Sequence, residues 1–133
     1  MKRTGKIDVS EWIKFGEADL RFASWGMKDN QPAFHSICFL CQASAEKYLK
    51  ALLLKNGWEL KRTHDMVFLL NKLKTECGCN VENMIEPVTY LNSFVENARY
   101  PGDVSIEYFS KEIAEKAIKS ALEVQTFACE KLV

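Results

Sequence analysis

Two short polar segments contain the residues best suited to bind an anion. The first is Lys61-Arg62-Thr63-His64-Asp65, which places two cations and an imidazole immediately before a predicted helix. The free N–H groups and the partial positive charge of a helix N-terminus favour a phosphate. In a purely structural interpretation, Thr63 and Asp65 only cap the helix. Arg62 then pairs with a carboxylate, and His64 packs.

The second segment, residues 96–103, lies at the end of another predicted helix. Arg99 can present its planar guanidinium group to a phosphate, or it can satisfy the last carbonyl groups of the helix. Tyr100 can stack on a nucleotide base. A proline and a glycine follow, and they favour a tight, ordered turn. The structural alternative is a pair between Arg99 and Asp103.

A polar stripe runs along the longest predicted helix, beside its apolar face, and consists of His35, Phe39, Gln42, Glu46 and Lys50. Such a stripe lies at the rim of a contact between helices or subunits, and Glu46 is a candidate for lining a ligand site. The alternative is a solvated helix edge with a Glu46–Lys50 pair, which contributes roughly a few tenths of a kcal/mol.

The sequence lacks the motifs of several enzyme classes. The chain has no Walker loop, no GxGxxG, no HExxH and no nucleophile elbow. His35 and His64 are the only histidines, so they are the only candidates for a general base at neutral pH. We expect no cofactor.

Five cysteines in a chain without a secretory signal indicate reduced thiols rather than a disulfide framework. Cys38, Cys41, Cys77 and Cys79 could together supply four thiolates to zinc. However, the first two fall on the apolar face of a predicted helix, where cysteine behaves as a small hydrophobe. Pairs of zinc ligands normally lie on turns, so we expect no metal site.

Length and charge limit the remaining possibilities. The 133 residues are enough for one domain, expected to span residues 1–133, but not for two. The sequence contains 18 basic residues (lysine and arginine) and 18 acidic residues (aspartate and glutamate), so the net charge is zero. A general nucleic-acid coat protein would be basic, so a polyanion must be bound by a local patch. No stretch approaches the length of a membrane span, and we expect a soluble, cytoplasmic chain without a membrane partner.

Apolar residues recur at three- and four-residue steps along most of the chain. This pattern predicts helices over residues 9–28, 32–57, 64–77, 80–98 and 111–132, the fourth interrupted by a turn or a kink at Pro87. The predicted caps are Asp8, Asn30, Thr63 and Ser110, and the predicted stops are Gly57 and Gly78. Period-two alternation never persists, so we expect an all-α fold, an up-and-down bundle of four to five helices.

The first predicted helix carries aromatic residues away from its main apolar seam, namely Phe15, Phe22 and Trp25. Such a second apolar surface suggests contact with a partner. A small bundle that wraps the helix on two sides explains it equally well. Together with Trp12, these residues also allow a function of pure protein docking.

Four groups of residues, in order along nearly the whole chain, carry a family resemblance. They are Ala18-Asp19-Leu20 with Ala23; Phe34-His35 with the run from Cys41 to Leu53; Arg62-Thr63-His64-Asp65 with Leu69-Leu70; and Ala98-Arg99-Tyr100-Pro101. The chain resembles the HEPN family (higher eukaryotes and prokaryotes nucleotide-binding) in its small stand-alone prokaryotic form. The motifs A-E-K-x-L-K-A-L-L, R-T-H-D and A-R-Y-P are fairly specific when they occur together.

The resemblance implies an all-α bundle that commonly forms a homodimer and binds nucleotide or RNA; DNA is not an expected partner. It also implies a minimal nucleotidyltransferase as a partner subunit, in a toxin–antitoxin pair. Many members are metal-independent endoribonucleases in which four to six residues separate the catalytic arginine from a histidine. Arg99 matches that arginine, but the histidine positions hold Val104, Ser105 and Ile106.

We therefore expect a nucleotide- or RNA-binding domain. The candidate binding residues are Arg62, His64, Arg99, Tyr100 and Glu46. The alternatives are an endoribonuclease toxin, with Arg99 and His64 as catalytic candidates, and a bundle that only docks other proteins.

Overall fold

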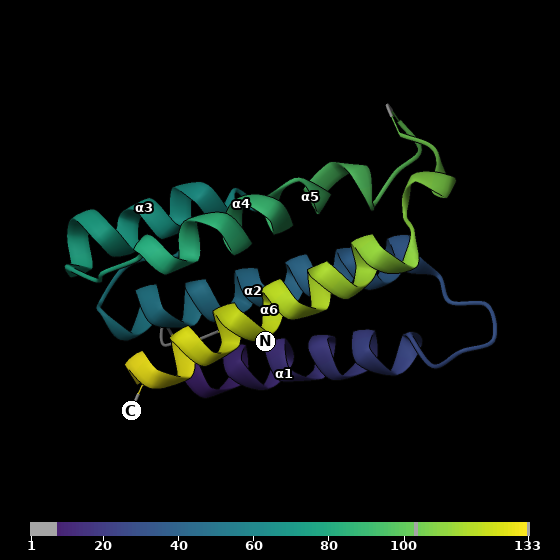
Figure 1. Ribbon diagram of the computed structural model, residues 1–133. Coiled ribbons are helices and arrows are strands. Elements are labelled where there is room, and N and C mark those ends of the chain that lie inside the picture. Colours follow the sequence, from purple (N-terminus) through teal and green to yellow (C-terminus); the bar gives the residue numbers. More distant parts are fainter. Residues whose placement is uncertain (1–7, 103, 133) are drawn as a thin grey trace, which may run out of the picture.

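The computed structural model describes residues 8–102 and 104–132, and over these ranges it contains helices and no strand (Figure 1). The α-helices are α1 (Val9–Gly26), α2 (Phe34–Lys55), α3 (Met66–Cys77), α4 (Ile85–Asn92), α5 (Phe94–Asn97) and α6 (Lys111–Leu132), with 3-10 helices at Glu82–Met84 and Ile106–Tyr108. The expected all-α class is confirmed, and the fourth predicted helix is divided into α4 and α5 at Ser93. Within the described ranges, no helix is both long and apolar enough to cross a membrane.

Helix α2 lies at the centre of the bundle. Figure 1 shows α1 on one side of α2 and the group α3, α4 and α5 on the other, with α6 running alongside. The C-terminal ends of α2 and α6 lie together, where Nζ of Lys55 donates a hydrogen bond of 2.7 Å to the carbonyl oxygen of Leu132. Because α2 lies at the centre, its side chains can contribute to sites on both sides of the bundle.

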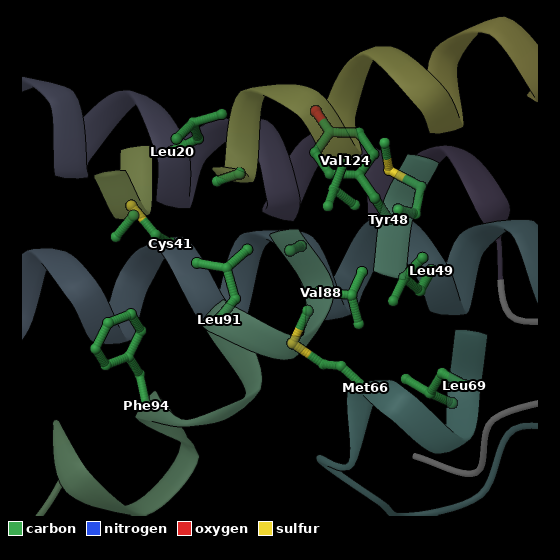
Figure 2. Packing of buried hydrophobic residues seen from close by; sticks show 14 of the residues in the cluster. Leu20, Cys41, Tyr48, Leu49, Met66, Leu69, Val88, Leu91, Phe94 and Val124 are labelled. Atoms are coloured by element: carbon green, nitrogen blue, oxygen red, sulfur yellow. The ribbon is translucent and has the colours of Figure 1, made fainter. Parts of the chain in front are cut away.

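The apolar face predicted for α2 forms the middle of the core. Its buried residues are Ile37, Cys38, Cys41, Ala45, Tyr48, Leu49 and Leu52, while Phe34 is partly buried. Side chains from the other helices surround this face, and Figure 2 shows Leu20 of α1, Met66 of α3 and Val88 of α4 among them. The three- and four-residue spacing in the sequence therefore identifies the buried side of this helix correctly.

Helix α1 approaches α2 closely at Gly16. A Cβ atom at this position would lie 3.1 Å from Cε2 of Tyr48 and 3.3 Å from the carbonyl oxygen of Ser44. The Ser44 hydroxyl donates a hydrogen bond of 2.7 Å to the Gly16 carbonyl oxygen. The Tyr48 hydroxyl in turn accepts a hydrogen bond of 2.8 Å from Nε2 of Gln125 in α6. Tyr48 therefore connects the three long helices.

Four of the predicted helix ends are confirmed. The Asp8 carboxylate accepts a hydrogen bond from the Ser10 N–H at the start of α1, and the Ser110 hydroxyl accepts one from the Ile113 N–H at the start of α6. Gly57 and Gly78 follow α2 and α3 with φ values of 86° and 68°, the left-handed conformation that glycine adopts without strain.

The other two predicted caps are wrong. Asn30 does not cap α2, because helical hydrogen bonding begins only at Ala33, whose carbonyl oxygen accepts from the Ile37 N–H. Thr63 does not cap α3, because that helix begins two residues later than predicted and its cap is Asp65. The Thr63 hydroxyl instead accepts a hydrogen bond from the Asp65 N–H, so it supports the capping residue.

Helix α1 leaves an apolar surface exposed to solvent. Phe15, Phe22 and Trp25 are 60%, 68% and 74% exposed, and the main packing contacts of α1 are with α2 and α6. The interpretation in which the bundle wraps α1 on two sides is therefore wrong. Trp12 differs from these residues, because it is half-buried and Nζ of Lys50 lies 5.7 Å from the centre of its ring.

Candidate functional site

The second half of the polar stripe of α2 is buried, whereas His35 and Phe39 are partly exposed. Gln42, Glu46 and Lys50 are all less than a tenth exposed. The Glu46 carboxylate accepts hydrogen bonds of 2.8 Å from Nε2 of Gln42 and 2.9 Å from Nζ of Lys50. The predicted Glu46–Lys50 pair is confirmed, whereas the solvated edge that the pattern also allowed is wrong.

His64 completes this buried network from the connector that precedes α3. Its Nδ1 lies 3.0 Å and 3.2 Å from the two carboxylate oxygens of Glu46. Burial alone would raise the pKa of Glu46, but the hydrogen bond and charge of Lys50, with the hydrogen bonds from His64 and Gln42, outweigh it and lower that pKa. Glu46 is therefore held ionised at neutral pH, and it is satisfied by three side chains.

The imidazole of His64 faces solvent on its other edge. Its side chain is 54% exposed, and the ring lines a surface hollow of about 460 Å³ together with Asp65, Asn92, Ser93, Val95, Glu96 and Asn97. We call this the His64 hollow. Because Nδ1 is engaged by Glu46, Nε2 is the nitrogen that remains for a bound molecule.

The N-terminus of α3 has no N–H group left for a phosphate in its first turn. Oδ1 of Asp65 accepts from the N–H groups of Val67 and Phe68 at 3.1 Å and 3.2 Å. Oδ1 of Asn92, from α4, accepts from the Met66 N–H at 2.9 Å. The capping carboxylate also adds a negative charge where the phosphate was expected. The capping role considered for Asp65 is therefore the one the structure shows.

Arg99 follows α5 in the chain and lies at a second hollow. Its guanidinium carbon is 4.9 Å from the ring centre of Phe39, a residue of the α2 stripe, and 5.9 Å from that of Tyr100. Arg99 is exposed, and among the described residues no carboxylate lies within 4 Å of it. Asp103, its alternative partner from the sequence, lies outside the described residues. The aromatic rings therefore hold the guanidinium group at the surface.

The hollow beside Arg99 also contains the second histidine. It has a volume of about 290 Å³ and is lined by His35, Asn97, Ala98, Arg99, Tyr100, Pro101, Gly102, Val104, Ser105, Ile106 and Phe109. We call this the Arg99 hollow. Nδ1 of His35 is buried without a hydrogen-bond partner in the described chain, and Nε2 lies 3.2 Å from the Ser36 hydroxyl.

The candidate residues thus fall into two groups. His64 lines the His64 hollow, with Glu46 buried behind it and bonded to its Nδ1, whereas Arg99 and Tyr100 line the Arg99 hollow. Asn97 lines both hollows, whereas Arg62, exposed in the connector, lines neither. Sequence reasoning missed Asn97 and the place of His35 beside Arg99, and no local motif could have shown either.

The cysteines of α2 are part of the core. Burial raises the pKa of the Cys38 thiol to about 12 and raises that of Cys41 as well, so both stay protonated at neutral pH. Among the residues described, no group of three or more histidine, cysteine, aspartate or glutamate side chains could hold a metal ion.

Comparison with known proteins assigns the family. The model of the HEPN domain matches residues 9–132. The chain belongs to the HEPN domain family. Two solved structures resemble this HEPN domain. TT1696 from Thermus thermophilus superposes with a TM-score of 0.80 and is 24% identical in sequence, and the match covers 92% of this chain and 97% of that chain. ST0689, an archaeal HEPN homologue, has a TM-score of 0.75 and 27% identity, and the match covers 100% of both chains. A comparison with curated proteins finds no match.

Proposed function

We propose that this HEPN domain binds nucleotide or RNA, with a phosphate group at Arg99. The observation that supports this most directly is the guanidinium group of Arg99, which lies close to the rings of both Phe39 and Tyr100 at the edge of the Arg99 hollow. A planar guanidinium group can donate two parallel hydrogen bonds to a phosphate. The exposed ring of Tyr100 can stack on a base, since stacking is the usual way in which proteins bind unpaired bases.

The charge balance of the chain favours anion binding at one local site over anion binding by a broad basic surface. A net charge of zero gives no general attraction for a polyanion. Binding then depends on a few placed cations, and Arg99 is the cation that lines a hollow containing aromatic and imidazole rings. Arg62 lies apart, and we assign it at most a contact with the phosphate backbone of a longer RNA.

We further propose that the domain acts in the cytoplasm as a homodimer and with a minimal nucleotidyltransferase, as one half of a toxin–antitoxin pair. Family membership supports this proposal, together with the exposed aromatic residues of α1. Three large apolar side chains on one helix are an unusual amount of surface to leave in water.

RNA cleavage is a second candidate, and one observation favours it. His35 lies in the same hollow as Arg99, although the two residues are far apart in the sequence. An imidazole beside a guanidinium group has the residue types needed to take a proton from a 2′-hydroxyl and to stabilise charge on phosphorus. His64, the catalytic candidate from the sequence, lines the other hollow.

Binding of a fluorescent single-stranded RNA, followed by anisotropy, tests the proposal. We expect Arg99→Ala to weaken binding about tenfold, the size of one lost hydrogen bond between charged groups. Arg21→Ala is the matched control, because Arg21 is an exposed arginine on α1, across α2 from α3–α5. Equal affinity of the wild type and Arg99→Ala contradicts the site.

The same samples, run on a denaturing gel, separate binding from cleavage. Intact RNA after incubation supports a binding domain. Fragments that appear with the wild type and disappear with His35→Ala select the ribonuclease instead. Absence of RNA and nucleotide binding in the wild type leaves only the protein-docking function.

A further inference from the structure

The described residues that line the two hollows differ in charge. The described residues that line the Arg99 hollow include a guanidinium group and no carboxylate. The described residues that line the His64 hollow include the carboxylates of Asp65 and Glu96, and neither lysine nor arginine. Like charges repel, so a phosphate is favoured in the first hollow and disfavoured in the second.

Most polar groups of the His64 hollow are already used within the chain. Asp65 and Asn92 cap α3, and the Ser93 hydroxyl donates a hydrogen bond of 2.7 Å to the Tyr90 carbonyl oxygen. Glu96 makes no ion pair within the described ranges. Glu96, Asn97 and Nε2 of His64 are therefore the groups available to a bound molecule.

These available groups favour a neutral ligand that donates hydrogen bonds. An ionised carboxylate only accepts, and its strongest neutral partners are hydroxyl and amide donors. Sugar hydroxyls match this requirement, and an acidic side chain is the usual partner of the ribose 2′-hydroxyl in dinucleotide-binding sites. The side chain of Val95 adds a small apolar surface on the same rim.

Asn97 connects the two hollows, because it lines both. Asn97 also lies two residues before Arg99 along the chain. A single nucleotide unit, whose phosphate and ribose are covalently joined, can therefore contact both hollows at once. Its phosphate would lie at Arg99, and its sugar would point past Asn97 towards Glu96.

We infer that the His64 hollow is a ribose-hydroxyl subsite, in which Glu96 accepts a hydrogen bond from the 2′-hydroxyl of the nucleotide whose phosphate binds Arg99. This inference rests on the proposed function. Glu46 has a positioning role in it: the carboxylate holds His64 Nδ1, so that the ring edge with Nε2 faces the sugar. The subsite selects ribonucleotides over deoxyribonucleotides.

The test compares RNA with DNA of the same sequence, measured by anisotropy with the wild type and Glu96→Gln. We expect the wild type to bind RNA about tenfold more tightly than DNA, and Glu96→Gln to lose most of this preference. Glu123→Gln, at an exposed position of α6, is the control for removing a negative charge, and its preference should equal that of the wild type.

Each outcome separates the inference from the proposed function. Binding of both nucleic acids with equal affinity overturns the ribose subsite and leaves phosphate binding at Arg99 standing. A preference for RNA that Glu96→Gln does not change also overturns the subsite. No binding of either nucleic acid by the wild type overturns both.

Discussion

The surroundings of His64 and Arg99 show two different ways of placing a polar group at a protein surface. His64 is held from below by Glu46, which is itself buried and bonded to Gln42 and Lys50. Arg99 is held from the sides by the rings of Phe39 and Tyr100. In the first arrangement a buried charge is compensated by hydrogen bonds, and in the second an exposed charge rests on apolar surface.

This difference determines what each arrangement contributes. Buried charges interact strongly and are costly when a partner is removed, so the His64 network is part of the stability of the fold. Exposed cation–π contacts contribute about 0.5–1 kcal/mol, so the Arg99 arrangement contributes little to stability and leaves the guanidinium group available. Substitutions in the His64 network and beside Arg99 should therefore differ in their effects on the unfolding free energy and on RNA affinity.

Glu46→Ala should have the largest effect. It leaves the ammonium group of Lys50 buried without its counter-ion, which costs about 3–5 kcal/mol of unfolding free energy. Urea denaturation measures this loss. The double variant Glu46→Leu/Lys50→Met removes both charges and should recover most of the stability. A loss below about 1 kcal/mol in Glu46→Ala contradicts the role assigned to the network.

The free energy of unfolding should depend on pH through the ionisation of the Glu46 carboxylate. The pKa of Glu46 in the folded protein lies below its ordinary value of 4.5, so the unfolded state binds a proton first as the pH falls. The stabilisation is therefore complete above pH 4.5 and is lost below it. Urea midpoints between pH 6 and pH 3 should fall more steeply for the wild type than for Glu46→Gln. Parallel slopes for the two proteins contradict this assignment.

Phe39→Leu should have the smallest effect. Leucine keeps apolar contact with the core but removes one ring beside the guanidinium group, so stability should fall by less than about 1 kcal/mol and RNA affinity by about threefold. Phe127→Leu removes a comparable ring beside Lys131 in α6 and should leave RNA binding unchanged. A loss of unfolding free energy above about 2 kcal/mol from Phe39→Leu alone would mean that the Arg99 arrangement is part of the structural core.

Much of the fold follows from local patterns. The spacing of Ile37, Cys41, Tyr48 and Leu52 marks the buried face of α2, because periodicity reports which side of a helix is apolar. Glycine stops at 57 and 78 are equally local, since they depend on the conformation of a single residue. These features need no knowledge of neighbouring elements.

The candidate site depends on contacts between distant segments. Asp65 and Thr63 are both good caps, and the choice of Asp65 is accompanied by a hydrogen bond from the Met66 N–H to Asn92 of α4. Glu46 and Lys50 have the spacing of an exposed pair, but side chains of distant segments lie against them: His64, just before α3, bonds to Glu46, and Trp12 of α1 lies beside Lys50. His35 lies near Arg99 only because α2 passes beneath the loop after α5. A single sequence contains no signal for such juxtapositions.

The contact between Gly16 and Tyr48 has a consequence for how this chain can change in evolution. A methyl group added at position 16 would press on the phenol ring that also bonds to Gln125. A side chain at position 16 therefore requires the Tyr48 ring and the Ser44 carbonyl group to shift by a few tenths of an ångström, and we expect positions 16 and 48 to vary as a pair among related chains. The absence of one carbon atom allows α1 to approach α2 this closely.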